Sequence, residues 1–565
     1  MKSIYEEKPW LKEYAAGVPP ELCIPSDQSL IDAFNQATEK WQNETAIVFY
    51  GNKIKYRELR DRVDRLATAL AAMGIKKGDR VALLLLNSPE YVISSFAVAK
   101  IGAVQTPISP VYVSSEIRHQ LLDSGAETII CQDILYEGVV KTGVKLKNVI
   151  LTNISESLPK LKNIMGKSIL RGVYQKMAAP APEIYKGEGI CRMSDLIEKY
   201  PPNPPAVEIN PREDLVMLPY TGGTTGSPKG VMITHYNVIS NIAQLAEITK
   251  VLESGQETVV GYMPFYHAAG GMSLYCAVFR GDTIVIVTTP DLDGILENVI
   301  RYKATYFVGA PTMYELLKDY EKTDRVRWKN IKMILSGADS LNEFTAKDWE
   351  ERTGNRITEG YGMTETTAIT HYNLLGKEKY GSIGVPACNT DSAILDPDED
   401  KYVPVGEIGE IVVAGPQIAK GYWQRPDATR ECEAIIEGKR WWRTGDLGRM
   451  DADGYFYFYD RKRDLIKYKG LKVFAREVEE VLKDHVHIKE VGVVGQPDPL
   501  VGQNVKAVIV LENDARGKLS EQDIMEYCKG KLAHYKIPSI IEFVGEIPKT
   551  DIGKVSRREI RTQEE

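Results

Sequence analysis

The sequence predicts an α/β protein with a large N-terminal part of layered sheets and helices, followed by a smaller α+β module. Three observations lead to this prediction. The chain has 565 residues, which is too long for one compact core, so several folding units are expected. Strand-like and helix-like patterns alternate along most of the chain, as they do in α/β layers. Beyond about Asp460 the pattern changes to that of a small separate module.

The first helix and strand are expected between Tyr56 and Leu86. Apolar residues of the helix recur every three or four positions: Leu59, Val63, Leu66 and Leu70. Gly74 ends this pattern, and the continuous apolar run that follows, Val81–Leu86, is typical of a buried strand. Further strands are expected at 103–113, 127–131, 149–151, 215–218, 282–287 and 305–310, with a helix at 292–302. The proline-rich segment 201–205 predicts a stiff linker at a subdomain border.

The C-terminal module is expected to mix helices and strands. Helices are predicted at 474–484 and 521–532, and strands at 490–494, 505–511 and 540–544. Together they form an α+β unit of about 100 residues, which is a common size for a domain.

Composition narrows the classes of function. With 43% hydrophobic and 26% charged residues and a net charge of −7, the chain resembles an ordinary soluble protein and not a nucleic-acid binder. Its seven cysteines form no Cys-x-x-Cys pair, so neither a disulfide framework nor a zinc site is expected, and a cytoplasmic location fits. Neither a signal peptide nor an apolar run long enough to span a membrane is found.

One basic segment, residues 159–176, carries apolar residues at roughly helical spacing and no acid. This pattern is compatible with weak peripheral membrane contact. A solvated insertion is favoured, because Gly166 and Gly172 interrupt a thin apolar stripe.

The most informative stretch, Tyr220–Gly230, reads Tyr-Thr-Gly-Gly-Thr-Thr-Gly-Ser-Pro-Lys-Gly. Its glycines allow N–H groups to converge on anionic oxygens: Gly222, Gly223 and Gly226. Hydroxyl donors and a cation accompany them: Thr221, Thr224, Thr225, Ser227 and Lys229. A proline precedes Lys229 and a glycine follows it, so this is not a Walker A loop. The stretch predicts a phosphate-binding loop, with a solvated surface turn as the alternative.

Four further motifs accompany this loop: Met-Pro-Phe-Tyr-His at 263–267, Gly-Tyr-Gly-Met-Thr-Glu at 360–365, Arg-Thr-Gly-Asp at 443–446 and Pro-Lys-Thr-Asp-Ile-Gly-Lys at 548–554. With them the chain resembles the adenylate-forming superfamily of acyl-CoA synthetases, luciferases and peptide-synthetase adenylation domains. The resemblance runs from about Asp27 to Arg558. It implies a β-barrel-like part within a large N-terminal domain, residues 1–462, and a small mobile C-terminal domain, residues 463–565.

The resemblance implies a two-step reaction that uses ATP, Mg²⁺ and CoA. A carboxylate resists attack by a thiol, because its own charge repels the nucleophile and oxide is a poor leaving group. The family therefore converts the acid to an acyl-adenylate with release of pyrophosphate, and then transfers the acyl group to a thiol. Positioned donors and a metal stabilise the charge-rich transition state of the first step.

By resemblance, Thr221 to Lys229 cover the β- and γ-phosphates, Thr364 lies beside the α-phosphate, and the Glu365 carboxylate holds magnesium. Capping of the following helix is the alternative for Glu365. Asp446 is expected to bind the ribose hydroxyls, with a simple turn as its alternative. Adenine is expected near two segments, with the Tyr361 ring available for stacking: Gly337, Ala338 and Asp339, and Glu359, Gly360, Tyr361 and Gly362.

The resemblance also assigns residues to the domain rotation between the two steps. Lys554 is expected to bridge the substrate carboxylate and the α-phosphate in the first step. Arg461 would reach phosphate or ribose oxygens, and Arg463 stands at the hinge, where the family more often has aspartate or lysine. Lys467 and Gly470 would lie on the face used in the second step, with Gly470 lining the pantetheine tunnel. A lysine-rich surface hairpin is the alternative reading of this segment.

The substrate is expected to be an acid with an uncharged tail. His267 would border its carboxylate, with a structural role as the alternative. Peptide-synthetase domains carry an aspartate after the residue that matches Phe265, where this chain has Tyr266, so no partner for a substrate ammonium is found. Small and apolar residues follow, and together with the similarity to fatty acyl-CoA synthetases they favour a medium- or long-chain fatty acid. An aryl acid, transfer to a carrier protein, luciferase chemistry and a non-enzymatic nucleotide-binding scaffold are alternatives, and the oligomeric state stays open, with a homodimer as one option.

Overall fold

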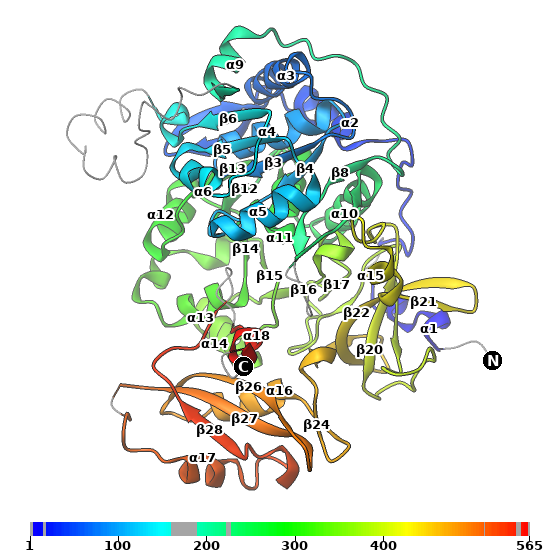
Figure 1. Ribbon diagram of the computed structural model, residues 1–565, viewed down its shortest axis with the longest axis vertical. Coiled ribbons are helices and arrows are strands. Elements are labelled where there is room, and N and C mark those ends of the chain that lie inside the picture. The colour runs from blue at the N-terminus through cyan, green and yellow to red at the C-terminus, as the bar shows by residue number, and fades with distance from the viewer. Residues whose placement is uncertain are drawn as a thin grey trace. The chain divides into compact units, whose positions relative to one another are not determined.

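The computed structural model describes residues 4–14, 18–159, 189–221, 228–513, 515–549 and 555–562 (Figure 1). It divides into two compact units. The larger unit comprises Trp10–Asp391 and Ala414–Glu431. The smaller unit comprises the N-terminal residues to Pro9, Ser392–Val413 and the chain from Cys432 onwards. The basic segment at 160–176 lies outside the described residues.

The larger unit contains a nine-stranded sheet whose central strands are all parallel. In spatial order the strands are β18 (Val385–Pro386), β17 (His371–Tyr372), β16 (Thr358–Tyr361), β15 (Met333–Ser336), β14 (Tyr306–Gly309), β12 (Thr258–Gly261), β13 (Thr283–Ile286), β1 (Thr45–Phe49) and β2 (Asn52–Lys55). Antiparallel pairs occur only at the two ends of this order, between β16, β17 and β18 and between β1 and β2.

A second sheet of the larger unit has seven strands. Their order is β11 (Ile233–Thr234), β8 (Leu215–Met217), β4 (Val104–Pro107), β3 (Arg80–Leu84), β5 (Thr128–Gln132), β6 (Asn148–Thr152) and β7 (Ile190–Arg192). Strands β8 to β7 in this order run parallel, and β11 is antiparallel to β8. A short antiparallel pair, β9 (Tyr220–Thr221) and β10 (Lys229–Gly230), stands apart from both sheets.

Helices cover both sheets because side chains alternate between the two faces of each strand. Between the sheets, α3 packs against β1 and β2, α4 against β3 and β4, and α11 against β12 and β13. The helices of this inner layer are α2 (Leu30–Lys40), α3 (Tyr56–Ala72), α4 (Pro89–Lys100), α10 (His235–Ile248) and α11 (Ala268–Arg280). The outer helices are α5 (Ser114–Ser124) and α6 (Tyr136–Lys141) on the seven-stranded sheet, and α12 (Leu292–Tyr302), α13 (Pro311–Asp319) and α14 (Glu343–Thr353) on the nine-stranded sheet (Figure 1). Two shorter helices, α9 (Met193–Lys199) and α15 (Pro426–Glu431), complete this unit.

The smaller unit contains two five-stranded sheets. The first consists of β19 (Asp391–Leu395), β20 (Gly409–Ala414), β22 (Lys439–Met450), β21 (Glu433–Ile436) and β23 (Phe456–Arg461), and β22 is antiparallel to β20, β21 and β23. The second consists of β25 (Leu471–Val473), β24 (Ile466–Tyr468), β27 (Gly502–Leu511), β26 (Ile488–Asp498) and β28 (Ile540–Phe543). Its helices are α1 (Ile4–Glu7), α16 (Ala475–Lys483), α17 (Glu521–Cys528) and α18 (Arg557–Thr562). Buried faces of β26, β27, α16 and α17 form the core of the C-terminal module.

The predicted fold class is confirmed, and most predicted elements are present. The helix at 292–302 has the predicted bounds. The strand expected at 103–113 ends at Pro107, because prolines at 107 and 110 cannot donate to a strand ladder. The helix expected at 521–532 ends at Cys528, and Gly530 adopts a positive φ of 78° just beyond it. None of the described helices is both long and apolar enough to cross a bilayer.

Glu90 is a buried acid in the first turn of α4. The helix begins after Ser88, whose side chain accepts a hydrogen bond from the N–H of Tyr91. The Glu90 side chain is only 4% exposed and accepts a hydrogen bond from the Ser157 hydroxyl. Burial raises the pKa of this carboxyl from 4.5 to about 7. The native state therefore favours the protonated form, so the stability linked to this group is present below pH 4.5 and is lost as the pH rises through 7.

We predict that Glu90→Gln raises the thermal midpoint at pH 8 and leaves it nearly unchanged at pH 4.5. The amide keeps the shape and the acceptor for Ser157 but carries no charge, and its gain at pH 8 is at most about 3 kcal/mol. Thermal unfolding at both pH values measures the difference. Exposed Glu39→Gln is the matched control. An equal effect of Glu90→Gln at the two pH values would contradict the linkage.

Candidate active site

The adenine-site candidates converge at one edge of the nine-stranded sheet. Strands β14, β15 and β16 are parallel, so their carboxyl ends lie together, where ligands bind in open α/β sheets. The N–H of Gly337, just after β15, donates to the carbonyl of Gly309 at 3.0 Å. Ala338 follows with φ of 72°, a left-handed conformation that costs free energy for a residue with a side chain. The structure thus brings together the two predicted segments at 337–339 and 359–362.

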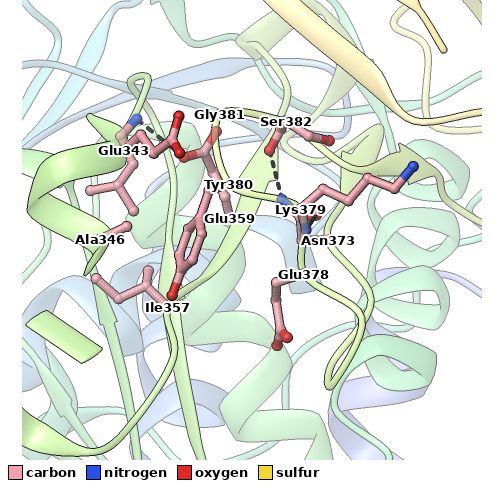
Figure 2. Close-up of a pocket in the computed structure, with 11 residues that line it drawn as sticks. Glu343, Ala346, Ile357, Glu359, Asn373, Glu378, Lys379, Tyr380, Gly381 and Ser382 are labelled. Carbon is pink, nitrogen blue, oxygen red and sulfur yellow. Dashed lines mark hydrogen bonds between the residues drawn. The ribbon is translucent and has the colours of Figure 1, made fainter. Parts of the chain in front are cut away.

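Glu359 is the buried acid of this edge. Its carboxylate accepts a hydrogen bond from the N–H of Leu341 at 3.2 Å. A cavity of ≈ 10 Å³ adjoins it, and Figure 2 shows Glu359 and Tyr380 among the residues that line it, with the Lys379 side chain pointing away from the others. That volume has room for about one water molecule. This cavity therefore holds neither an acyl chain nor a nucleotide.

Tyr361 and His371 are cross-strand neighbours on β16 and β17. Their ring centroids lie 5.6 Å apart in an edge-to-face arrangement. His371 is fully buried, and burial lowers its pKa from 6.5 to about 3. The imidazole beside the predicted adenine-stacking ring is therefore neutral at physiological pH.

Thr364 and Glu365 begin a short 3₁₀ helix, Thr364–Thr366. Thr364 is half-buried, whereas the Glu365 side chain is only 6% exposed. The hydroxyl of Tyr422 donates to Glu365 Oε1 at 2.7 Å, and the N–H of Ala419 donates to the Glu365 carbonyl at 2.9 Å. Glu365 is thus held through both its side chain and its backbone. Sequence reasoning did not identify Tyr422, because nothing near position 422 indicates a partner at 365.

The predicted phosphate loop is described only at its two ends. Gly222, Gly223, Thr224, Thr225, Gly226 and Ser227 lie outside the described residues. On either side of them Thr221 pairs with Lys229, and Tyr220 pairs with Gly230. The Lys229 ammonium lies 5.2 Å from the centroid of the Tyr422 ring. Nε2 of His119 on α5 forms a hydrogen bond to the carbonyl oxygen of Pro228 at 2.9 Å.

Asp123 at the C-terminal end of α5 anchors both segments that border this region. Its carboxylate accepts a hydrogen bond from the Tyr220 hydroxyl at 2.8 Å and forms an ion pair with Arg425 at 2.6 Å. The indole N–H of Trp423 donates to the Asp123 carbonyl at 3.2 Å. The strand before the phosphate loop and the segment around Tyr422 therefore share one support.

His267 caps α11, and its Nδ1 accepts from the N–H of Ala269 at 3.4 Å. It is half-buried at the end of the loop that follows β12. Asn87 holds this loop: its side chain accepts from the N–H of Phe265 at 2.9 Å and donates to the carbonyl of Met263 at 2.8 Å. Asn87 was not predicted, because it lies far away in sequence, before α4. The observed helix cap supports a structural role for His267. Its role at the substrate carboxylate stays a prediction.

In the smaller unit, Asp446 and Arg461 are cross-strand partners on β22 and β23. Their side chains form an ion pair with an N–O distance of 2.9 Å. Asp446 is almost fully buried, and its N–H donates to the Thr444 hydroxyl at 3.1 Å. The structure thus brings the predicted ribose ligand Asp446 together with Arg461, which is predicted to reach phosphate or ribose oxygens.

Lys467 and Gly470 lie in an exposed hairpin of β24 and β25. The two residues of the turn, Lys469 and Gly470, have φ of 48° and 80°, as in the turns that match strand twist. A Cβ at Gly470 would meet no atom within 4 Å, so the turn conformation accounts for this glycine. The hairpin alternative is therefore observed, and the role of Gly470 in a pantetheine tunnel stays a prediction.

Lys554 lies outside the described residues, and its neighbours are closely anchored. Val555 pairs with Lys549, and the N–H of Ser556 donates to the carbonyl of Pro548 at 2.7 Å. Arg557 then forms ion pairs with Glu479 at 2.6 Å, Asp460 at 2.9 Å and Asp464 at 3.1 Å. These three carboxylates raise the pKa of Arg557 further above its ordinary value, against the effect of burial.

Comparisons with known proteins agree with this arrangement. The family model described as AMP-binding enzyme matches residues 34–423, and that of the AMP-binding enzyme C-terminal domain matches residues 477–554. The chain is 35% identical over 563 residues to a long-chain-fatty-acid–CoA ligase of Bacillus subtilis (strain 168), covering 99% of this chain and 98% of that protein. It is 32% identical over 519 residues to feruloyl-CoA synthase of Amycolatopsis sp, covering 92% and 95%. ATP-bound MatB from Rhodopseudomonas palustris has a TM-score of 0.80 at 26% identity, covering 95% of this chain and 99% of that one.

The chain therefore belongs to the AMP-binding enzyme family. Within it, the chain is an AMP-forming acyl-CoA synthetase, and the reaction class expected from the sequence is confirmed.

Gly362 lies at the start of the tight loop that contains Glu365. A Cβ at this position would lie 1.6 Å from the carbonyl oxygen of Ala368, so the loop closes against itself. We predict that Gly362→Ala displaces this loop, lowers stability by about 1–3 kcal/mol and weakens binding of a non-reactive ATP analogue by about tenfold or more. Thermal unfolding and calorimetric titration measure the two effects.

Gly545→Ala is the matched control, because a Cβ there meets no atom within 4 Å. Wild-type nucleotide affinity in Gly362→Ala would show that the tight loop at 362–368 has no part in nucleotide binding.

Proposed function

We propose that this acyl-CoA synthetase activates a medium- or long-chain fatty acid with ATP and transfers it to CoA. The observation that carries the proposal is the grouping of Lys229 and Glu365 around one tyrosine at the phosphate loop. A cation and a buried carboxylate suit a phosphate chain with its magnesium ion. The named activity of the Bacillus subtilis relative supports a long aliphatic acid.

The residues at the carboxyl edge suit a magnesium ion bound together with ATP. Glu365 offers a hard oxygen ligand, which Mg²⁺ prefers. Within the described ranges, no group of three or more His, Cys, Asp or Glu gathers as a metal site, so the other ligands are expected from phosphate oxygens and water. When bound, the ion would neutralise phosphate charge. Thr221, Thr364 and Lys229 would orient the phosphates, and Asp446 with Arg461 would bind the ribose.

The second step is proposed to use the C-terminal module. Lys554 would serve adenylation, and the hairpin with Lys467 and Gly470 would serve thioester formation. The chain would pivot at the boundary between residues 462 and 463, with Arg463 as the hinge. The predictions of peripheral membrane contact through 159–176, of a homodimer and of a cytoplasmic location stay open.

An aryl acid is the second candidate for the substrate. The observation in its favour is the 32% identity to a feruloyl-CoA synthase over most of both chains. His267 and the loop held by Asn87 would border the carboxylate in either case. The two candidates differ in the acid's tail, which a panel of acids distinguishes.

We predict that kcat/KM rises with the length of an aliphatic acid. Each buried methylene contributes about 0.8 kcal/mol, or roughly a fourfold gain, until the pocket is filled. The purified protein is incubated with ATP, Mg²⁺, CoA and acetate, octanoate, palmitate, benzoate or ferulate, while AMP and the acyl-CoA product are measured. A higher kcat/KM for ferulate or benzoate than for every fatty acid would favour the aryl alternative.

We predict that Lys554→Ala slows adenylate formation by about 100-fold or more, because it removes a cation from a charge-rich transition state. Transfer of the acyl group from supplied acyl-adenylate to CoA should stay near the wild-type rate. Pyrophosphate exchange measures the first step, and acyl-CoA formation measures the second. Lys549→Ala is the control in the same segment, since Lys549 pairs with Glu490 at 2.9 Å. Equal loss of both steps in Lys554→Ala would be inconsistent with separate faces for the two steps.

A further inference from the structure

Tyr422 is a buried tyrosine next to the phosphate loop, about 190 residues later in sequence. The N–H of Met232 donates to the carbonyl of Gly421 at 2.9 Å, and the N–H of Trp423 donates to the carbonyl of Gly230 at 2.8 Å. These bonds pair the Tyr422 segment with the chain just after Lys229. The side chain of Tyr422 is 8% exposed.

The hydroxyl of Tyr422 contacts the proposed metal ligand. It donates to Glu365 Oε1 at 2.7 Å. A hydrogen bond to an ionised carboxylate is shorter and stronger than one between neutral groups, and it fixes the orientation of the acceptor. A carboxylate is planar, so the bond that holds Oε1 also fixes the position of Oε2.

The ring of Tyr422 contacts the second charged group. The Lys229 ammonium lies 5.2 Å from its centroid, which is within the range of a cation–π interaction. The same side chain therefore orients a carboxylate through its hydroxyl and a cation through its ring. Both charged groups come from segments that the sequence predicted for phosphate and magnesium.

The position of the tyrosine is itself well supported. Its N–H donates to the Thr429 hydroxyl at 2.9 Å. On its C-terminal side, Trp423 and Arg425 both bind Asp123, which also binds Tyr220 before the phosphate loop. Such rigid support is what a positioning group needs, because small displacements of metal ligands change affinity strongly.

We propose that Tyr422 is a positioning residue that sets Glu365 for the metal ion and Lys229 for the phosphates of ATP. The inference rests on the proposed function of Glu365. The two contacts of Tyr422 have different consequences. Loss of the hydroxyl weakens metal binding, whereas loss of the ring also weakens nucleotide binding.

The test measures binding without turnover. Manganese replaces magnesium so that free metal can be followed by electron paramagnetic resonance, with α,β-methylene-ATP as a nucleotide that cannot form an adenylate. In Tyr422→Phe, we expect the Kd for manganese in the ternary complex to rise about tenfold. This is the lower end of the loss in metal affinity that follows removal of a hydrogen-bond partner of a metal ligand. The affinity for the metal-free analogue should change less than about twofold. In Tyr422→Leu, metal-free affinity should fall as well.

Two further variants keep the outcomes distinct. Tyr14→Phe is the matched control, because Tyr14 is also buried and its hydroxyl donates to the carbonyl of Pro386 at 2.7 Å. Glu365→Gln tests the metal assignment itself, and unchanged manganese binding in it would overturn that part of the proposed function. A second outcome is that Glu365→Gln weakens manganese binding while Tyr422→Phe binds manganese like wild type or like Tyr14→Phe. The positioning role of Tyr422 would then be wrong, and the metal assignment of Glu365 would stand.

Discussion

A carboxylate removed from water needs a partner, and this constraint organises the site around Glu365. Its side chain is almost fully buried and meets the hydroxyl of Tyr422. That contact requires the segment at 420–423 to lie beside the chain that leaves the phosphate loop, and the backbone bonds between 230–232 and 420–423 provide this proximity. The loop from Gly362 to Ala368 must in turn close tightly, which leaves no room for a Cβ at Gly362. One buried carboxylate is thus held where three segments of the chain meet.

The sequence predicted the fold class and most long elements because their signals are local. Apolar spacing placed α3 and α12, and the continuous apolar run placed β3. Element ends were less accurate where a proline or a glycine decided them, as at Pro107 and Gly530. Motif residues such as Glu365 and Asp446 were identified by resemblance, since their spacing alone would also fit a helix cap or a turn.

The partners of those motif residues could not be predicted in the same way. Tyr422, Asn87 and Asp123 act through contacts across 57, 178 and 97 residues of sequence, and no local pattern distinguishes them from ordinary core or surface residues. His371 has the same character: pairing of β16 with β17 buries it beside Tyr361 and keeps it neutral. Strand pairing and long-range contacts create such environments, and a single sequence does not show which residues they bring together. The conformation of the 469–470 turn accounts for Gly470 without any ligand, so its predicted place in a pantetheine tunnel stays a prediction.

The anchoring of the chain around Lys554 limits how that lysine can travel. Val555, to which it is covalently joined, pairs with Lys549, and Arg557 fixes the next turn to three acids. Between these two anchors, each residue can add at most about 3.6 Å of reach. Delivery of this ammonium to a substrate, or its withdrawal, would therefore depend on displacement of the whole module as a rigid body. Inserting residues into this loop would extend the reach of the ammonium by at most about 3.6 Å each and would place it less precisely.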